Sequence, residues 1–429
     1  MTLTGLIFFA AFFLAIGLAF TRHPIYGLYA YMMAFYVHPP SRWWGASLPD
    51  LRWAMLSAAA TVLAIWFRGG QLKSKPSWLS TTPARIMIAY VLWFWLGTLW
   101  ALDRTQHVPQ ATLLTKFLLL FYIFYRLVDS HREATLVLLL HLAGCFYLGY
   151  LGFTTPSEGG RLDGVGGPGI NDSNTLGMHL ATGVVAGAMM ILYLKGYRKY
   201  LCIVAIAFAI NGIVMTGSRG AALALLAGGL TLFFLRPTAY KRAFMAYAVL
   251  GLFLIGILAS GEFWNRMQTL KAVQSENQSE LDSSARSRIA MFEAQAKMAA
   301  KYPLGTGHRG SEILSPEYLD KIYLTASGYR SSHNSFMTVL VEQGIPGVLL
   351  SLLLIGWTAR TLLMIRRRSQ GGGEDMAITS AQAAAIGGAL VVVVVGGFFA
   401  DFAHCEVQIW MFAILAVTAQ NVVAATGAT

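Results

Sequence analysis

Long apolar segments separated by short polar ones form the dominant pattern of this chain. From residue 84 onward they lie at 84–101, 108–128, 134–153, 173–194, 200–216, 218–235, 241–260, 334–365, 380–399 and 404–425. A run of roughly 17–25 apolar residues is the length that an α-helix needs to cross the ~30 Å core of a bilayer. The pattern therefore predicts an all-α polytopic membrane protein.

Residues 1–68 are less regular, with shorter apolar runs at 3–20, 25–37 and 53–67. Three full crossings would place the N-terminus outside the cell, whereas two crossings and one re-entrant run would place it in the cytoplasm. Because two of these runs are short for a bilayer core, we favour about 12 transmembrane helices with both termini cytoplasmic. The first run has no basic segment before it, so we expect it to be retained rather than cleaved as a signal peptide.

Charged residues sort the connecting loops into two sides. They make up only 12% of the 429 residues, against 56% hydrophobic; soluble domains carry about 25% charged residues. The lysines and arginines behind the net charge of +12 concentrate in alternate loops, around 73–75, 126–132, 195–199, 236–242 and 366–368. The positive-inside rule makes these loops cytoplasmic. Since no basic stripe is interleaved with aromatic residues, we do not expect nucleic acid as a partner.

The longest aqueous segment, 261–333, lies on the opposite side and divides the chain. We expect residues 1–260 to hold transmembrane helices 1–10, residues 261–333 to form one large outer loop with amphipathic surface helices, and residues 334–429 to hold the C-terminal transmembrane helices. Within the loop the spacing predicts a helix over 285–300 that ends before the Tyr302-Pro303 pair. Its apolar stripe would contain Ile289, Phe292, Ala296 and Ala299.

Four polar elements fall on this outer side. They are "GGRLDGVGGPGINDSNTLG" (159–177) with Arg161, Asn171 and Asn174, "TGSRGA" (216–221) with Arg219, "SARSRIAMFEAQ" (284–295) with Arg286 and Arg288, and "SSHNSFMTVLVEQGIPG" (331–347) with His333, Asn334 and Glu342. Glycines allow close approach of a ligand, and arginine offers a planar fork for phosphate. Ordinary explanations compete with function: a flexible turn, an arginine that reaches the headgroups, a solvated basic face and a polar helix start.

His333 differs by its aqueous position from three histidines of the apolar runs. His38, His141 and His179 lie in or near apolar runs, and we expect packing to satisfy each of them. His333 precedes a span that Asn334 or Ser335 could cap. An imidazole with an ordinary pKa near 6.5 can take a proton from a hydroxyl at neutral pH.

Several kinds of site are not indicated. The outer loops contain no paired histidines, cysteines or Asp-x-Asp doublet, so we expect no bound metal. The chain has no Gly-Lys-Ser/Thr phosphate loop, so ATP is not expected, and we expect no other cofactor. Cys145, Cys202 and Cys405 show no metal or disulfide spacing. Carboxylates deep in the spans are scarce. This argues against an ion-coupled transporter, which needs buried carboxylates as coupling sites.

Several arginines and one histidine on the same side favour one type of chemistry. Arginines bind a pyrophosphate and stabilise it as a leaving group through charge-assisted hydrogen bonds, while the histidine deprotonates an acceptor hydroxyl. This is group transfer from an activated donor. Because the donor has to reach the membrane face, a lipid pyrophosphate fits.

These residues resemble the O-antigen ligase and polymerase superfamily. The likeness rests on "SHNSFMTVLVEQGIPG" (332–347), "TGSRGA" (216–221), "SRIAMFEAQ…YPLGTGHRG" (287–310) and the stretch 161–174. It covers residues 155–350, while the N-terminal third is similar mainly in hydropathy. The segment "GINDSN" is similar to the ligase-like branch found alongside exosortase systems.

The resemblance implies an enzyme of the bacterial inner membrane with a GT-C-like glycosyltransferase architecture and its active site facing the periplasm. Such an enzyme moves O-antigen glycan from undecaprenyl pyrophosphate to a lipid A–core hydroxyl in lipopolysaccharide assembly, without metal and with inversion. The resemblance also implies that His333 is the general base. It implies that the pyrophosphate ligands are Arg161, Arg219, Arg288 and, more weakly, Arg286. The supporting residues would be Asn334, Asn174 and Glu342.

Two alternative enzymes would use the same outer face, and a third alternative is not an enzyme. A repeat-unit polymerase would take another lipid-linked glycan as acceptor, and a protein O-oligosaccharyltransferase would take Ser or Thr. A passive lipid-glycan transporter would need arginines along a path through the bundle, whereas here they cluster on one side.

Overall fold

The computed structural model describes residues 2–155, 161–258, 283–402 and 404–427, and these form helices and no β-strand. The longer helices are α1 (Leu3–Thr21), α2 (Ile25–Val37), α3 (Trp53–Arg68), α4 (Thr82–Gly97), α5 (Arg104–Leu127), α6 (His131–Thr154), α7 (Ser173–Tyr193), α8 (Tyr197–Thr216), α9 (Arg219–Leu235), α10 (Lys241–Leu258), α12 (Ser283–Lys301), α15 (Ser335–Arg368), α16 (Glu374–Gly396) and α17 (Glu406–Ala425). The short helices α13 (Gly310–Ile313) and α14 (Ser315–Tyr318) follow α12.

Eight of the described helices are long and apolar enough to cross a membrane: α1, α5, α6, α7, α8, α15, α16 and α17. A ninth span results if α9 and residues 238–251, which are bent by 112°, count as one. Helices α2, α3 and α4 contain 13, 16 and 16 residues and are short for a bilayer. The fold is thus an all-helical, polytopic membrane protein, and the count of 12 spans stays a prediction.

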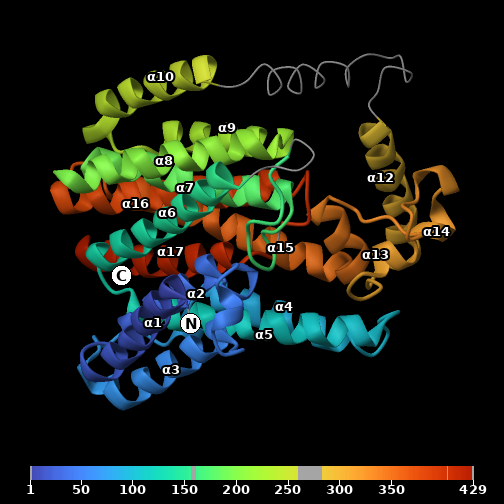
Figure 1. Ribbon diagram of the computed structural model, residues 1–429, viewed down its shortest axis with the longest axis horizontal. Helices are drawn as coiled ribbons and strands as arrows, with labels where there is room; N and C mark the ends of the chain where they lie inside the picture. The colour runs from blue at the N-terminus through green and yellow to red at the C-terminus, as the bar shows by residue number, and fades with distance from the viewer. Residues whose placement is uncertain (1, 156–160, 259–282, 403, 428–429) are drawn as a thin grey trace.

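The helix bundle is built around α7 and α16, which pack against α6, α8 and α9. Most helices run along the long axis of the molecule, with α1–α3 gathered at one side and α12–α14 beyond one end (Figure 1). Small residues allow the close packing: a Cβ atom at Gly388 of α16 would lie 2.5 Å from the Val185 side chain of α7. Close approach through small residues is typical of helices packed in a membrane.

The two ends of the bundle differ in charge. At one end, here called the basic end, Lys75 donates hydrogen bonds to the carbonyls of Tyr125 and Val128, and Lys195 pairs with Glu374. At the other, here called the outer end, lie residues 161–172, 216–219 and 397–405, with α12–α14 beside them. The polar elements singled out in the sequence therefore share one end.

The chain termini lie near different ends. Thr2 donates its backbone N–H to Ser47, and Arg42 in the same connection between α2 and α3 reaches the Val165 carbonyl of the outer end. Thr426 instead contacts Arg368, close to the basic end. This packing favours the alternative with three crossings in residues 1–68 over the arrangement that we favoured from the sequence. The side of the membrane on which each terminus lies stays a prediction.

The predicted surface helix exists as α12, and the face that packs on the protein is not the apolar stripe named from the sequence. Ile289 and Phe292 are exposed and Met291 is buried, while Ala294 and Met298 are buried against Leu314 and Val341. The spacing of apolar residues fits two faces of this helix, and packing against α15 selects the one with the methionines. The part of the predicted loop at 261–282 lies outside the described residues.

Candidate functional site

His333 sits at the outer end in a left-handed backbone conformation, with φ of 51°. A non-glycine residue rarely adopts this conformation, and such strain is often found at functional sites. The next residue, Asn334, caps α15 as predicted: its side-chain oxygen accepts from the backbone N–H groups of Phe336 and Met337, both at 3.1 Å. The cap fixes where α15 begins and holds His333 at its entrance.

The segment after α16 brings a carboxylate to His333. Ser335 donates its backbone N–H to Gly397 (2.7 Å) and its hydroxyl to Ala400 (2.8 Å), and it accepts from the Phe402 N–H (2.8 Å). Asp401, between these anchor points, accepts a hydrogen bond from Thr338 Oγ1 at 2.9 Å and another from the His333 backbone N–H. The sequence analysis missed Asp401, since it lies 68 positions beyond His333 and in no recognised motif.

Charges from four segments surround the imidazole. Burial lowers the pKa of His333 from its ordinary value, Arg288 and Arg330 lower it further, and the carboxylates of Asp401 and Asp172 raise it. The pKa of His333 is lowered overall, so its imidazole is neutral at neutral pH. The neutral form is the one that accepts a proton.

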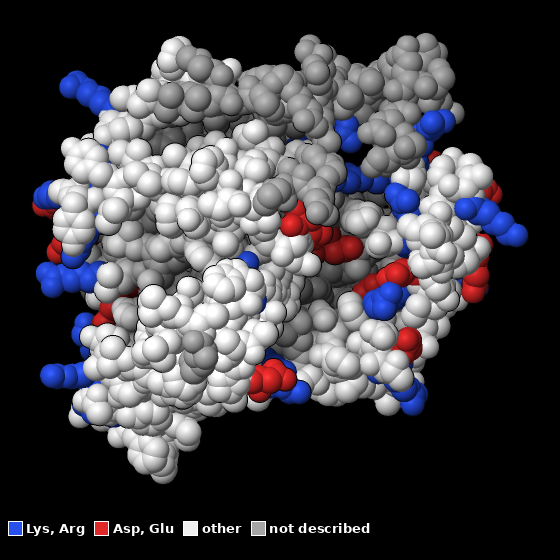
Figure 2. All heavy atoms as spheres, viewed as in Figure 1, with Lys and Arg blue, Asp and Glu red and all other residues white. Residues whose placement is uncertain are grey.

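Asp401 lies in a recess of the outer end. Its side chain reaches the surface, yet surrounding protein removes most of its water, so desolvation raises its pKa while the hydrogen bond from Thr338 and the nearby His333 oppose that shift. Figure 2 shows acidic and basic side chains facing one another across a hollow between the bundle and α12–α14.

Two arginines on the α12–α14 side face His333. Arg288 belongs to the first turns of α12. Arg330 is anchored twice, by its backbone N–H to Ser315 (2.8 Å) and by its guanidinium to Ser287 (2.5 Å). Arg286, the weaker prediction, is exposed to solvent. Sequence reasoning missed Arg330, because nothing in "ASGYR" distinguishes it from other loop arginines.

Arg161, Asn174 and Arg219 come together on the bundle side. Arg161 donates to the Thr216 carbonyl (2.9 Å) and to Asn174 Oδ1 (3.3 Å), and Asn174 also accepts from Ser218 (2.9 Å), the cap of α9. Arg219 follows as the first residue of α9. The predicted first and second polar elements are therefore in contact.

Asp172 connects that group to His333. Its side chain caps α7 by accepting from the N–H groups of Asn174 (3.0 Å) and Thr175 (3.2 Å). The same carboxylate acts electrostatically on His333. Asp172 therefore connects Asn174, which Arg161 contacts, to the surroundings of His333, to which Arg288 of α12 also belongs.

Glu342, predicted as a supporting residue, contacts another histidine. Its carboxylate lies 3.2 Å from His308 Nδ1. The His308 backbone donates to His107 Nδ1 (2.9 Å), so the proton of His107 resides on Nε2, which donates to the Phe94 carbonyl (2.8 Å). Glu342 thus supports the loop around His308 rather than touching His333.

A break in α15 explains the glycines that follow Glu342. Gly344 has φ of 66° and ψ of −167°, outside helical values. The carbonyls of Val341 and Glu342 accept instead from the N–H groups of Thr306 and Gly307, both at 3.0 Å. Glycine is required because a Cβ atom at Gly344 would lie 2.3 Å from the Pro303 carbonyl oxygen. Residues 302–310 and 342–347, noted separately in the sequence, form one structural unit.

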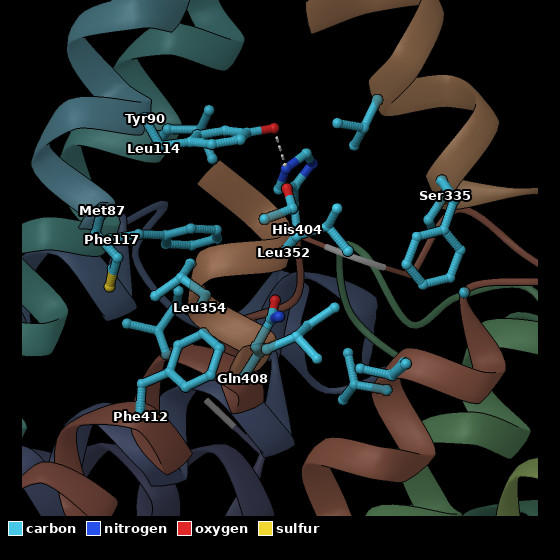
Figure 3. Close-up of a pocket in the computed structure, with 18 of the residues that line it drawn as sticks. Met87, Tyr90, Leu114, Phe117, Ser335, Leu352, Leu354, His404, Gln408 and Phe412 are labelled. Atoms are coloured by element: carbon cyan, nitrogen blue, oxygen red, sulfur yellow. Dashed lines mark hydrogen bonds between the residues drawn. The ribbon is translucent and has the colours of Figure 1, made fainter. Parts of the chain in front are cut away.

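An apolar pocket of about 120 Å³ opens beside the first turn of α15. It lies between α4, α5, α15, α16 and α17, and the side chains of Phe117, Leu352 and Phe412 form its apolar walls (Figure 3). At its polar end are Ser335 and His404; the latter bonds Tyr90 at 3.0 Å, and burial lowers the pKa of His404 to about 4. The pocket is therefore mostly apolar, and its polar end lies next to the segment of His333.

The core histidines largely behave as expected. His38 bonds Ser41, and both ring nitrogens of His141 have partners, Tyr36 and Thr182. His179 bonds Tyr36 through Nε2, whereas its Nδ1 has no partner among the described residues. Donor atoms of His141, Cys145 and His179 lie within 4.8 Å of one another, but the Tyr36 hydroxyl already bridges the two imidazoles. We interpret the group as hydrogen bonding between α2, α6 and α7.

Comparison with known proteins identifies one family. The family model described as O-antigen ligase matches residues 203–352, a range that contains Arg219, Arg288 and His333. Arg161, Asn174 and Asp401 lie outside it. No curated protein matches the chain. The match confirms the resemblance to O-antigen ligases over this range, without separating the exosortase-associated branch from the others.

Proposed function

Since residues 203–352 carry the domain of the O-antigen ligase family, we propose that this protein transfers O-antigen glycan from undecaprenyl pyrophosphate to a hydroxyl of lipid A–core. The observation that carries the proposal is the arrangement around His333. A neutral imidazole, a carboxylate and two arginines act on one another two residues before Ser335, which lines an apolar pocket. This set matches a hydroxyl acceptor and an anionic leaving group on a lipid.

The proposed reaction is a single displacement. His333 removes the proton of the acceptor hydroxyl while its oxygen attacks the anomeric carbon of the donor. The bond from that carbon to the pyrophosphate oxygen breaks, and undecaprenyl pyrophosphate leaves with the electron pair. Attack opposite the leaving group inverts the anomeric configuration. Asp401 stabilises the imidazolium that forms, as a carboxylate beside a catalytic histidine does.

The arginines would bind the pyrophosphate. Arg288 and Arg330 belong to the α12–α14 side, and Arg161 and Arg219 belong to the bundle side. The anion would lie between these two pairs of arginines. Charge that develops on the leaving group would be met by guanidinium groups already held in place. Arg330 joins the predicted set, and Arg286 is the weakest member because it points to solvent.

The apolar pocket would take the first isoprene units of the donor lipid. Its aromatic and aliphatic walls suit a hydrocarbon chain, and its polar end at Ser335 and His404 adjoins the segment of Asp401. A lipid tail in this pocket would bring its pyrophosphate to the arginines without a charge entering the membrane core.

Placement in the cell follows from this chemistry. We propose that the protein resides in the bacterial inner membrane with the outer end, and the loop predicted from residue 261 to residue 333, in the periplasm. The basic end would face the cytoplasm, in accord with the positive-inside rule. We further propose that the reaction needs neither metal nor ATP.

A repeat-unit polymerase and a protein O-oligosaccharyltransferase remain the alternatives, because all three enzymes would share the donor site. A passive transporter fits less well, since the arginines gather at one end.

The test is a reconstituted transfer assay with purified undecaprenyl-pyrophosphate glycan and lipid A–core, in EDTA, with wild type and His333→Ala. Product from wild type alone supports a metal-independent ligase with His333 as base. Longer lipid-linked glycan, or glycan on an added protein acceptor, would identify one of the alternatives. Normal turnover by His333→Ala would overturn the assignment of the base.

A further inference from the structure

A second hollow, of about 510 Å³, lies on the other side of α5 from the donor pocket. It is bounded by α2, α3, α5 and the start of α17, and Pro168 of the outer end closes one side. Phe117 lines both hollows. His404 borders the first and Glu406 the second, so the two hollows flank the short segment that follows Asp401.

Lys116 is the unexpected residue in this second hollow. It lies in the middle of α5, 12 residues after Arg104 and 11 before Leu127, which is about 18 Å and about 16 Å from the two helix ends. Its side chain is exposed. The same hollow is lined by Pro168 of the outer end and by Asp50 and Arg52 of the connection between α2 and α3. Lys116 therefore faces a space that reaches the level of the lipid headgroups, where a cation beside apolar walls suits an anionic headgroup.

The carboxylates near Lys116 do not explain it. Among the described residues, Lys116 forms no ion pair. Glu406 lines the hollow, but its carboxylate accepts a hydrogen bond from the Tyr31 hydroxyl. Asp50 is exposed and lies two positions from Arg52, a second cation in the lining. The hollow therefore offers two cations and lipid-facing apolar walls, including the exposed side chains of Met55 and Leu119.

We propose that this second hollow binds the acceptor, a phosphate-bearing glycolipid. Lys116 and Arg52 would hold phosphate near the acyl chains, and the chains would lie along α3 and α5. This inference rests on the proposed function. It adds a separate site for the acceptor, so donor and acceptor lipids approach Asp401 and His333 from opposite sides of α5.

The experiment measures lipid binding apart from catalysis. Purified protein in nanodiscs of phosphatidylcholine with lipid A as the probe is released into native mass spectrometry, and the lipid A retained per protein is counted. The variants are Lys116→Met, which keeps the length of the side chain without its charge, Lys116→Arg, which keeps the charge, and Lys195→Met, a matched loss of charge at the basic end.

We expect Lys116→Met to retain about tenfold less lipid A or worse, the effect of one lost charge-assisted contact. Lys116→Arg and Lys195→Met should retain it as wild type does. Thermal stability of Lys116→Met should not fall, because the substitution removes a charge from a membrane helix. In the transfer assay the KM for acceptor should rise by a similar factor, with the KM for donor unchanged.

Three results would overturn the proposal: equal retention by Lys116→Met and wild type, equal loss in Lys195→Met, or equal binding of phosphatidylglycerol in place of lipid A. The last would identify a general site for anionic lipid. His333→Ala should bind lipid A normally, so failure of the transfer reaction and failure of this binding site give different results.

Discussion

The two ends of the bundle each hold a histidine beside an aspartate, and only one of these pairs has the surroundings of a reaction site. At the basic end, His131 lies 3.6 Å from Asp375, whose side chain is 86% exposed. At the outer end, His333 and Asp401 share a recess with Asp172, Arg288 and Arg330. Enclosure and nearby cations, rather than the pairing itself, distinguish the outer end.

The cations at the two ends also differ in what they contact. Arg68 and Arg126 donate to backbone carbonyls, of Phe20 (2.7 Å) and Lys73 (2.7 Å), and so hold helix ends together. Arg288 and Arg330 instead act on the imidazole of His333 from another part of the chain. A count of basic residues therefore distinguishes the basic end, while their position relative to a titrating group distinguishes the candidate site.

The largest expected effect comes from removing the imidazoles. His333→Ala should lower transfer by about 10²–10⁴-fold, the usual contribution of a general base, with donor binding retained. His131→Ala, the matched change at the basic end, should leave the rate within about twofold, in line with ordinary surface substitutions. Initial rates in the reconstituted assay decide this. Equal losses in the two variants would mean that the comparison of the ends is wrong.

Removing the arginines should have the next largest effect. Arg288→Ala or Arg330→Ala should weaken donor binding by about 1.5–3 kcal/mol, the value of a charge-assisted contact. Arg68→Ala should leave donor binding unchanged, since its partners, two backbone carbonyls and the Gln71 side chain, lie at the basic end. Titration of each variant with the lipid pyrophosphate gives the dissociation constants, and an equal loss for Arg68→Ala would contradict the assignment.

Removing the carboxylates should have a smaller effect. Asp401→Asn should slow transfer by roughly tenfold, which corresponds to one pKa unit of imidazolium stabilisation. Asp375→Asn should not change the rate. Steady-state kinetics with saturating donor provides the measurement. An Asp401→Asn enzyme as fast as wild type would show that this carboxylate does not act through His333.

The smallest effect should be a shift of the pH profile. The base acts when neutral, so kcat/KM should rise with pH through the pKa of His333 and then level off, with a midpoint below the ordinary value near 6.5. Asp401→Asn removes a charge that raises this pKa, so the midpoint should move to lower pH. Arg288→Ala removes a charge that lowers it, so the midpoint should move to higher pH. Shifts in the opposite directions would refute the proposed surroundings of His333.

Much of the fold could be predicted because lipid imposes a strong local rule. Apolar runs had to be helices, so α4–α9 and α15–α17 lie close to their predicted ranges, and the cap at Asn334 needed only its neighbours. The N-terminal region was harder, since runs as short as α2 fit both a crossing and a re-entrant segment. The buried face of α12 depended on packing against α15, which spacing alone does not reveal.

The candidate site was predicted only where its residues lie in motifs. His333, Arg288 and Arg219 were found that way, and the structure groups them at one end. Asp401 and Arg330 were missed because hydrogen bonds between distant segments, such as Ser335 to Ala400 (2.8 Å), bring them to His333. Glu342 was predicted only as a supporting residue; that it contacts His308 and not His333 depends on the fold of residues 302–310.

The break at Gly344 sets a fixed height for the reaction. The 34 residues of α15 would extend about 51 Å as one rod, far more than a bilayer core. The break divides it into a membrane helix of 24 residues, Ile345–Arg368, and a shorter helical segment of about 14 Å that follows His333. Because residues 303–307 bind both sides of the break, the segment before it is held in place. Under the proposed function, only a hydroxyl presented at that distance from the membrane would meet the imidazole of His333.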